Sequence, residues 1–426
     1  MLDRITPPLA SPLNSIVLPR YESTKLDNGL PVYFLPYGNA EVIEVKAVFQ
    51  AGKSYQSKAG LAAATANMLS EGTKNYSALA LSQALDQQGA WMGPEVAHES
   101  LTLSLTTLTK HIPATLPLLA EVIFEPTFPK DRFDLFKARK AESLSVKELK
   151  TSFQAPRTFG HLLFGKEHPY GMHLSRTELQ DVALDDVKAY HSTFLAKGPY
   201  ALIFTGQFDE KVIIGLLNEF FGEKNRAEVQ GDSKAAGLKS QNVSGRHVAA
   251  VEGMQSTVRL GHVGFRRSHP DYYRVKLVDT ILGGYFGSRL MANIREDKGY
   301  TYGIYSNWVS LKHDGYFMIQ GDVGNEYVEP TIKEVYFEMN RLIQDGVDQA
   351  ELDLVKNYII GKNISNRETP FQLGDIILYA VVNGISFEEL DQQFEIIQSV
   401  QAKEIREIAE KYFKPEALLE VVAGKG

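Results

Sequence analysis

Apolar and polar side chains follow two spacings along this chain. Residues 41–49 alternate apolar and polar positions, which predicts a strand. Residues 115–123 carry Leu, Val and Ile at helical spacing, and Pro117 is expected in the first turn of that helix. Strand pairs are mixed with longer helices, without strict alternation of strand and helix. This arrangement predicts the α+β class.

The pattern of the first half recurs in the second. Residues 182–206 and residues 400–424 each predict an amphipathic helix, a short loop and an apolar strand that ends in Gly, at a constant offset of 218. A weaker echo pairs residues 86–91 with residues 297–302. In both of these a helix ends at a Gly, for which a left-handed cap is expected. Two matches in the same order predict two tandem homologous domains, each a mainly antiparallel sheet with helices packed on it.

The predicted boundary between the domains lies where the apolar periodicity stops. Residues 222–237 are polar, punctuated by Gly and nearly free of large apolar side chains, which is typical of a linker. We therefore expect an N-terminal domain at 1–222, a linker at 223–245 and a C-terminal domain at 246–426.

Composition excludes several classes of function. A net charge of -7 over 426 residues argues against nucleic acid or an anionic membrane as a partner. The chain has no cysteine, so it forms no disulfide and has no thiolate chemistry. Residues 1–8 hold an acid and two prolines where a secretory signal would be apolar, and no apolar run reaches the roughly 18 residues that span a bilayer. A cytoplasmic protein is the simplest interpretation, and the periplasm stays open as an alternative.

Residues 59–73 are the most informative about function. They read Ala-Gly-Leu-Ala-Ala-Ala-Thr-Ala-Asn-Met-Leu-Ser-Glu-Gly-Thr. This run resembles the segment that carries the inverted zinc motif His-x-x-Glu-His in the insulinase, pitrilysin and mitochondrial-processing-peptidase family. The flanking residues match, but the positions of the two zinc-binding histidines and the general-base glutamate hold Ala63, Asn67 and Ala66. The resemblance therefore implies a family member of the bacterial two-domain type whose zinc motif is lost.

The same resemblance implies a third zinc ligand, a glutamate on a later helix. Glu148 is the predicted position, and Glu142 is the alternative. Since a zinc site needs three protein ligands, one carboxylate cannot make it, and no metal is expected in this chain. No two of the ten histidines are four residues apart on a predicted helix, as a pair of zinc ligands would be. His168 and His173 flank a loop, and His262 is expected to be a packed or surface residue.

Two more segments match the family without carrying chemistry. The glycines of residues 282–288 lack the Lys of a phosphate-binding loop and are expected to form a turn between helices. Residues 366–370, Asn-Arg-Glu-Thr-Pro, stand where the family often has a Glu-Thr-Pro turn.

One functional segment is intact. It reads Ser-Arg-Leu-Met-Ala-Asn-Ile-Arg-Glu-Asp-Lys-Gly-Tyr-Thr-Tyr-Gly from Ser288, and it resembles the family segment in which an Arg and a Tyr lie seven residues apart, here Arg295 and Tyr302. Ser288 is expected to cap a helix, Gly299 to end it, and Tyr302 to lie on the following strand. The resemblance implies that this pair contacts the substrate near the scissile peptide. Guanidinium and phenol groups are suitable donors to a carbonyl oxygen that gains negative charge.

The sequence therefore predicts a non-catalytic, substrate-binding subunit of a zinc metallopeptidase. Its expected partner is a homologous subunit that carries His-x-x-Glu-His and zinc, in a heterodimer that binds unfolded peptides in a shared chamber; a homodimer is the alternative in isolation. A second hypothesis is a scaffolding homologue with no role in proteolysis, in which Arg295 pairs with Glu296 and Tyr302 is a half-buried strand residue. A third is an active peptidase with displaced ligands.

Overall fold

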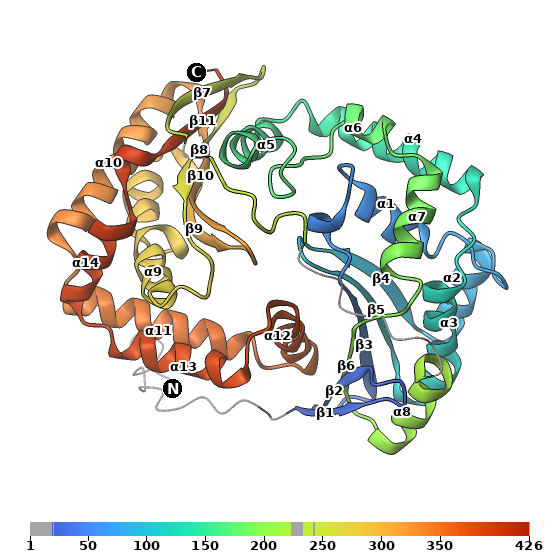
Figure 1. The fold of residues 1–426 in the computed structure, drawn as a ribbon. Helices are drawn as coiled ribbons and strands as arrows, with labels where there is room; N and C mark the ends of the chain where they lie inside the picture. The colour runs from blue at the N-terminus through green and yellow to red at the C-terminus, as the bar shows by residue number, and fades with distance from the viewer. Residues whose placement is uncertain (1–18, 20, 223–232, 242, 426) are drawn as a thin grey trace, which may run out of the picture.

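The computed structural model describes residue 19 and residues 21–222, 233–241 and 243–425. Two sheets with helices packed against them form the molecule, so the predicted α+β class is confirmed (Figure 1). Residues 223–232 and 242 of the predicted linker and the first 18 residues lie outside the described residues. The predicted domain boundaries themselves stay a prediction.

The first sheet has the order β1-β2-β6-β3-β5-β4, in which only β2 and β6 run parallel. Its central strand β6 is buried along its whole length, which suits its continuous apolar run Ala-Leu-Ile-Phe. The strands are β1 (Glu22–Lys25), β2 (Pro31–Pro36), β3 (Val42–Phe49), β4 (Trp91–Val96), β5 (Leu101–Leu108) and β6 (Ala201–Gly206).

The second sheet has the order β7-β11-β8-β10-β9, in which only β7 and β11 run parallel. This order matches the sequence β2-β6-β3-β5-β4 of the first sheet position by position. The duplication therefore extends to strand order and direction. The strands are β7 (Gly245–Ala250), β8 (Gln255–Val263), β9 (Thr301–Ser310), β10 (Gly315–Gly324) and β11 (Leu419–Gly424).

Helices pack on both sheets, most of them on the outer faces (Figure 1). In the first half of the chain they are α1 (Leu61–Met68), α2 (Ala78–Gln87), α3 (Ile112–Phe124), α4 (Lys130–Lys147), α5 (Thr151–Phe164), α6 (Arg176–Gln180), α7 (Leu184–Phe194) and α8 (Glu210–Leu217). In the second half they are α9 (Tyr272–Asp279), α10 (Val328–Asp345), α11 (Gln349–Ser365), α12 (Pro370–Asn383), α13 (Phe387–Ser399) and α14 (Ala402–Tyr412).

The repeated elements lie where the sequence predicted them. The pair α7 and β6 corresponds to α14 and β11 at the same offset in sequence. The two predicted left-handed glycines are also present, with φ of 59° at Gly89 and 66° at Gly299. The prediction for Pro117 is wrong. Pro113 occupies the first turn of α3, and Pro117 lies inside the helix, where its ring leaves one backbone carbonyl without its usual donor.

Two helices are exchanged between the halves. Helix α5, from the first half, packs against β8 and β11 of the second sheet (Figure 1). Its residues Ala155, Phe159 and Leu163 recur every fourth position, so they share one face, and that face joins a core with Leu419 and Val421 of β11.

Helix α12, from the second half, packs in return against β6 and β2 of the first sheet. Leu373 and Ile377 are buried there against Leu35, Val48 and Ile203. Each fully buried aliphatic side chain contributes roughly 1.5–3 kcal/mol of hydrophobic free energy.

A glycine permits the close approach of helix and sheet in each of these two contacts, α12 on the first sheet and α5 on the second. A Cβ on Gly374 of α12 would lie 2.9 Å from Cγ2 of Thr205 in β6. A Cβ on Gly261 of β8 would lie 2.9 Å from the ring of Phe159 in α5. Both distances are shorter than carbon atoms tolerate, so a larger residue at either position would push the helix from the sheet.

Local sequence signals determine where α12 begins and ends. Thr369 caps it by accepting a hydrogen bond from the backbone N–H of Gln372, and Pro370 occupies the first turn. Gly384 ends it in the left-handed conformation, with φ of 63°.

Within the described residues no single helix is long and apolar enough to cross a bilayer. Helices α12 and α13 meet that test only as a pair, and the pair is bent by 103°.

Candidate functional site

The segment with the lost zinc motif folds as the short helix α1. Gly60, with φ of 85°, precedes the helix. Ala66 is only 1% exposed and belongs to the hydrophobic core of the first half, whereas Ala63 is partly exposed and Asn67 is exposed. The amide Nδ2 of Asn67 donates a hydrogen bond to the carbonyl oxygen of Ala63, 2.7 Å away. Residues 63 and 67 thus share one face, as two zinc ligands would, but neither offers an imidazole.

The two candidates for the third ligand differ in their surroundings. Glu148 ends α4 and accepts hydrogen bonds from the backbone N–H of Arg176 at 2.7 Å and from its guanidinium Nε at 2.8 Å. Burial acts to raise the pKa of Glu148, but the hydrogen bonds and charge of Arg176 outweigh it and hold the pKa below its usual range. Glu142 is exposed on α4. The structure thus uses Glu148 as the ion-pair partner of Arg176, and the position of the third ligand stays a prediction.

A zinc ion does not fit the residues of this segment. Across the described parts of the chain, no group of three His, Asp or Glu side chains is placed to hold a metal ion. His262 is a packed residue, as predicted: its Nδ1 lies 2.7 Å from the carbonyl oxygen of Val263, and its ring packs against Trp308 and Phe317.

We expect the purified protein to contain no stoichiometric zinc, because Ala63 and Asn67 stand where two imidazoles are needed. Elemental analysis of the desalted chain checks this. About one zinc per chain that resists desalting and leaves only with a chelator would contradict the prediction.

A variant with Ala63→His and Asn67→His tests the alignment of the third ligand. It leaves Ala66 unchanged, because a glutamate there would enter the core. We expect this variant to bind zinc, to lose the metal with Glu148→Ala and to keep it with Glu142→Ala. The reverse pattern would assign the position to Glu142.

Arg295 and Tyr302 lie close together, Arg295 on a helical segment and Tyr302 on the strand that follows it. Arg295 belongs to the π-helical segment Met291–Asp297, and Tyr302 lies near the start of β9. The Arg295 guanidinium carbon is 5.6 Å from the centre of the Tyr302 ring and 4.3 Å from that of Phe286. These contacts are attractive cation–π interactions. The nearest acid is Glu296, at a long 4.0 Å.

A β-bulge turns Tyr302 out of the sheet. Ile304, Ser306 and Trp308 of β9 point into the core, and unbroken alternation would bury residue 302 with them. The pairing of β9 with β10 slips at this point, so that Tyr302 and the next residue both lie opposite Asp322. Tyr302 is therefore 92% exposed. Bulges of this kind often re-aim side chains beside functional sites.

Thr301 stabilises the bulge. Its hydroxyl donates toward the carbonyl oxygens of Asp322, at 2.6 Å, and Gly303, at 2.9 Å, and it accepts from the N–H of Gly303 at 3.1 Å. The hydroxyl of Tyr302 has no hydrogen-bond partner within the described residues, so it is available as a donor.

One expectation for this segment is wrong. Ser288 precedes the helical residues, but its hydroxyl is buried and makes no hydrogen bond to the helix start. The backbone carbonyl of Ser288 instead accepts from the N–H of Ala292. The predicted turn between helices at 282–288 is present, since the π-helical segment Thr280–Gly284 ends there before the next helical residues begin.

Two family models match the chain. The model described as "Insulinase (Peptidase family M16)" matches residues 37–155, and the one described as "Peptidase M16 inactive domain" matches residues 181–359. Together the two matches cover most of the chain, and the second begins at residue 181, within the first half.

Individual proteins agree with these models. The chain is 24% identical over 310 residues to "Uncharacterized zinc protease YmxG" of Bacillus subtilis, covering 71% of this chain and 73% of that protein. It is 25% identical over 335 residues to "Non-peptidase homolog YmxG" of Helicobacter pylori, covering 76% of each. A crystal structure of a peptidase M16 inactive domain from Pseudomonas fluorescens has a TM-score of 0.86 at 23% identity and covers 95% of this chain and 98% of that one. At this identity the likeness shows a shared fold.

Proposed function

Because the chain belongs to the M16 (insulinase) peptidase family and lacks its zinc-binding residues, we propose that it is the non-catalytic, substrate-binding subunit of a zinc metallopeptidase. The partner is a homologous chain with an intact His-x-x-Glu-His motif, which supplies the metal and the attacking water. The ligand is an unfolded peptide, held in a chamber that both chains line.

The exposure of Tyr302 carries this proposal. A tyrosine that is 92% exposed leaves most of its ring in water, and the bulge that causes the exposure breaks the regular pairing of two strands. Among the described residues the phenol hydroxyl has no hydrogen-bond partner, and the neighbouring guanidinium has only the long 4.0 Å ion pair with Glu296, so both are suited to donate hydrogen bonds to a peptide carbonyl.

The position of β9 supports peptide binding as well. It pairs with β10 and is the last strand of its sheet among the described residues, so one side of its backbone has no strand partner. An extended peptide can add to such an edge through main-chain hydrogen bonds, and this brings its carbonyl groups to Tyr302. The chain would then hold the substrate while the partner performs the chemistry.

Reconstitution tests the proposal. The chain, the homologue with an intact motif from the same genome and an equimolar mixture are each incubated with a fluorogenic unstructured peptide, and complexes are sized by light scattering. We expect a heterodimer and hydrolysis by the mixture far above that of either chain alone. A zinc-bearing homologue that is fully active by itself and unaffected by this chain would reject the proposal and leave the scaffolding role.

A further inference from the structure

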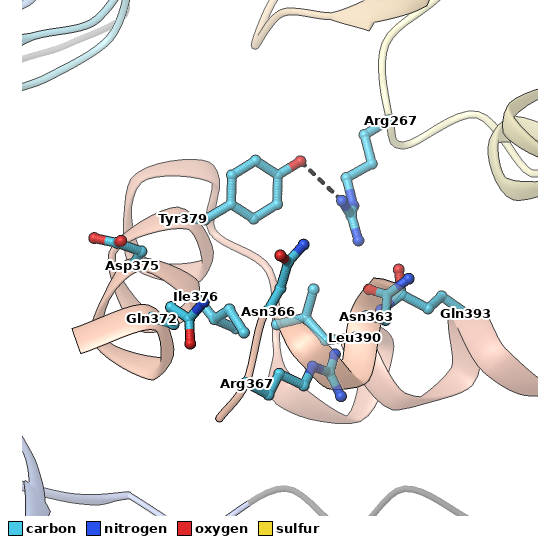
Figure 2. A pocket seen from close by; sticks show the side chains of 10 residues that line it. All are labelled: Arg267, Asn363, Asn366, Arg367, Gln372, Asp375, Ile376, Tyr379, Leu390 and Gln393. Carbon is cyan, nitrogen blue, oxygen red and sulfur yellow. Dashed lines mark hydrogen bonds between the residues drawn. The ribbon is translucent and has the colours of Figure 1, made fainter. Parts of the chain in front are cut away.

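A separate pocket of about 380 Å³ lies in the second half of the molecule (Figure 2). The end of α11, the turn before α12, helices α12 and α13, and the loop after β8 surround it. Arg267 enters from that loop, and Asn366 and Arg367 enter from the turn. No chemical role was predicted for this turn, in which Thr369 caps α12.

Arg367 is a buried cation with unsatisfied donors. It is 8% exposed, and its Nε and Nη1 have no hydrogen-bond partner among the described residues. Its guanidinium carbon lies 4.8 Å from the centre of the Phe394 ring. Burial lowers the pKa of Arg367, and the negative charge of Asp391 opposes this effect only in part. A buried guanidinium without compensation is unfavourable, so its presence points to a ligand that supplies the missing charge.

Arg267 provides a second cation with only neutral partners. It donates to the hydroxyl of Tyr379 at 2.8 Å, drawn in Figure 2, and to the hydroxyl of Tyr273. Its guanidinium also lies within about 5.5 Å of the rings of Tyr272, Tyr273 and Tyr379. These rings orient the group but do not neutralise it, and no ion pair with a carboxylate forms among the described residues.

Neither acid near the pocket forms an ion pair with Arg367 or Arg267 among the described residues. Asp375 lines the pocket, but one of its oxygens pairs at 3.0 Å with Lys46 of β3, which Glu44 shares at 2.9 Å. Asp391 lies near Arg367 without forming an ion pair. The other polar groups of the wall are neutral amides, those of Asn363, Asn366, Gln372 and Gln393.

We propose that this pocket binds a carboxylate group, which Arg367 and Arg267 hold through charge-assisted hydrogen bonds. A guanidinium presents paired donors that match the two oxygens of a carboxylate. The carboxylates of Asp375 and Asp391 lie nearby and repel a phosphate dianion more strongly than a singly charged anion, so a carboxylate fits the pocket better. The C-terminal carboxylate of a peptide and a small free carboxylic acid share this chemistry. The proposal does not depend on the heterodimer or on Tyr302.

Calorimetric titration of the whole chain tests the proposal with trialanine, amidated trialanine, acetate and inorganic phosphate as probes. We expect trialanine to bind and amidated trialanine not to bind. Comparable binding of acetate would identify a site for free acids; tighter binding of trialanine would identify a peptide C-terminus. Tighter binding of phosphate than of either carboxylate would overturn the assignment.

The variant Arg367→Met keeps the length of the side chain and removes its charge. We expect it to bind trialanine at least tenfold more weakly, since a hydrogen bond to a charged group typically carries that factor or more. The ligand-free variant should melt no lower than the wild type, because an unpaired buried charge is gone. Arg341→Met, on α10 and outside this pocket, is the matched control and should bind normally.

A second variant, Arg267→Gln, measures the contribution of the other cation to binding, and it should also bind trialanine more weakly than the wild type. Wild-type affinity in Arg367→Met, or equal binding of trialanine and its amide, would refute the carboxylate site. Because the measurement needs no peptidase partner, its outcome is independent of the heterodimer.

Discussion

Tyr302→Phe and Arg295→Ala are expected to cut peptide turnover by the reconstituted complex a hundred- to a thousandfold, about 2.7–4 kcal/mol of transition-state stabilisation each. The reason is that each change removes a donor that acts on the carbonyl oxygen only as its negative charge develops. The loss should therefore fall on kcat at saturating peptide. It should also appear with a fully metallated partner, because the zinc is bound by the other chain.

The same variants should leave folding and association nearly unchanged. Tyr302 is exposed, and Arg295 contacts mainly the rings of Phe286 and Tyr302 itself. Tyr305→Phe is the matched control, because it removes a phenol hydroxyl from another partly exposed position of β9. Wild-type turnover in both Arg295→Ala and Tyr302→Phe, or equal losses in Tyr305→Phe, would show that this surface has no part in catalysis.

Phe159→Ala is expected to destabilise the protein by about 3–5 kcal/mol, the usual cost of truncating a buried aromatic side chain. Phe159 is 1% exposed, and its ring lies 6.0 Å from that of Tyr316 and beneath the guanidinium of Arg259, at 5.0 Å. Although it belongs to the first half of the chain, it fills the core beside the second sheet. The defect should therefore appear in the second half.

Urea unfolding measures the loss, and hydrogen exchange locates it. Amides of β8 and β11 should lose protection more than those of β3 and β5. Leu149→Ala, two residues before α5 and 74% exposed, is the control and should change the free energy of unfolding by less than about 0.5 kcal/mol. A small effect of Phe159→Ala, or one confined to the first sheet, would mean that α5 contributes little to its partner.

The features of the fold that depend on the spacing of apolar residues were predicted from the sequence. The fold class, the repeated helix and strand, and the left-handed glycines follow from local spacing and from one residue type each. Periodicity also shows that α5 and α12 have a buried face, but it does not specify which sheet buries it. The exchange of these helices was therefore not predicted.

The sites were predicted less completely for similar reasons. The matching pattern placed Arg295 beside Tyr302, but the bulge that exposes the tyrosine depends on the pairing of β9 with β10, which no local spacing reveals. Ser288 looked like a helix cap because hydroxyl residues often are, yet its side chain is buried without a bond to the helix. Arg367 gave no signal, since an arginine before a polar turn usually lies in water.

The exchanged position of α12 also constrains how the chain folds while it is being synthesised. The first sheet has all its strands once Gly206 is made, but the helix that covers Leu35, Val48 and Ile203 begins at Pro370, about 160 residues later. At ribosomal rates of about 5–20 residues per second, this leaves a delay of roughly 8 to 30 seconds. During that time the nascent protein presents an apolar sheet face to other chains. Translation that stops between these residues would leave that face uncovered for as long as the fragment survives.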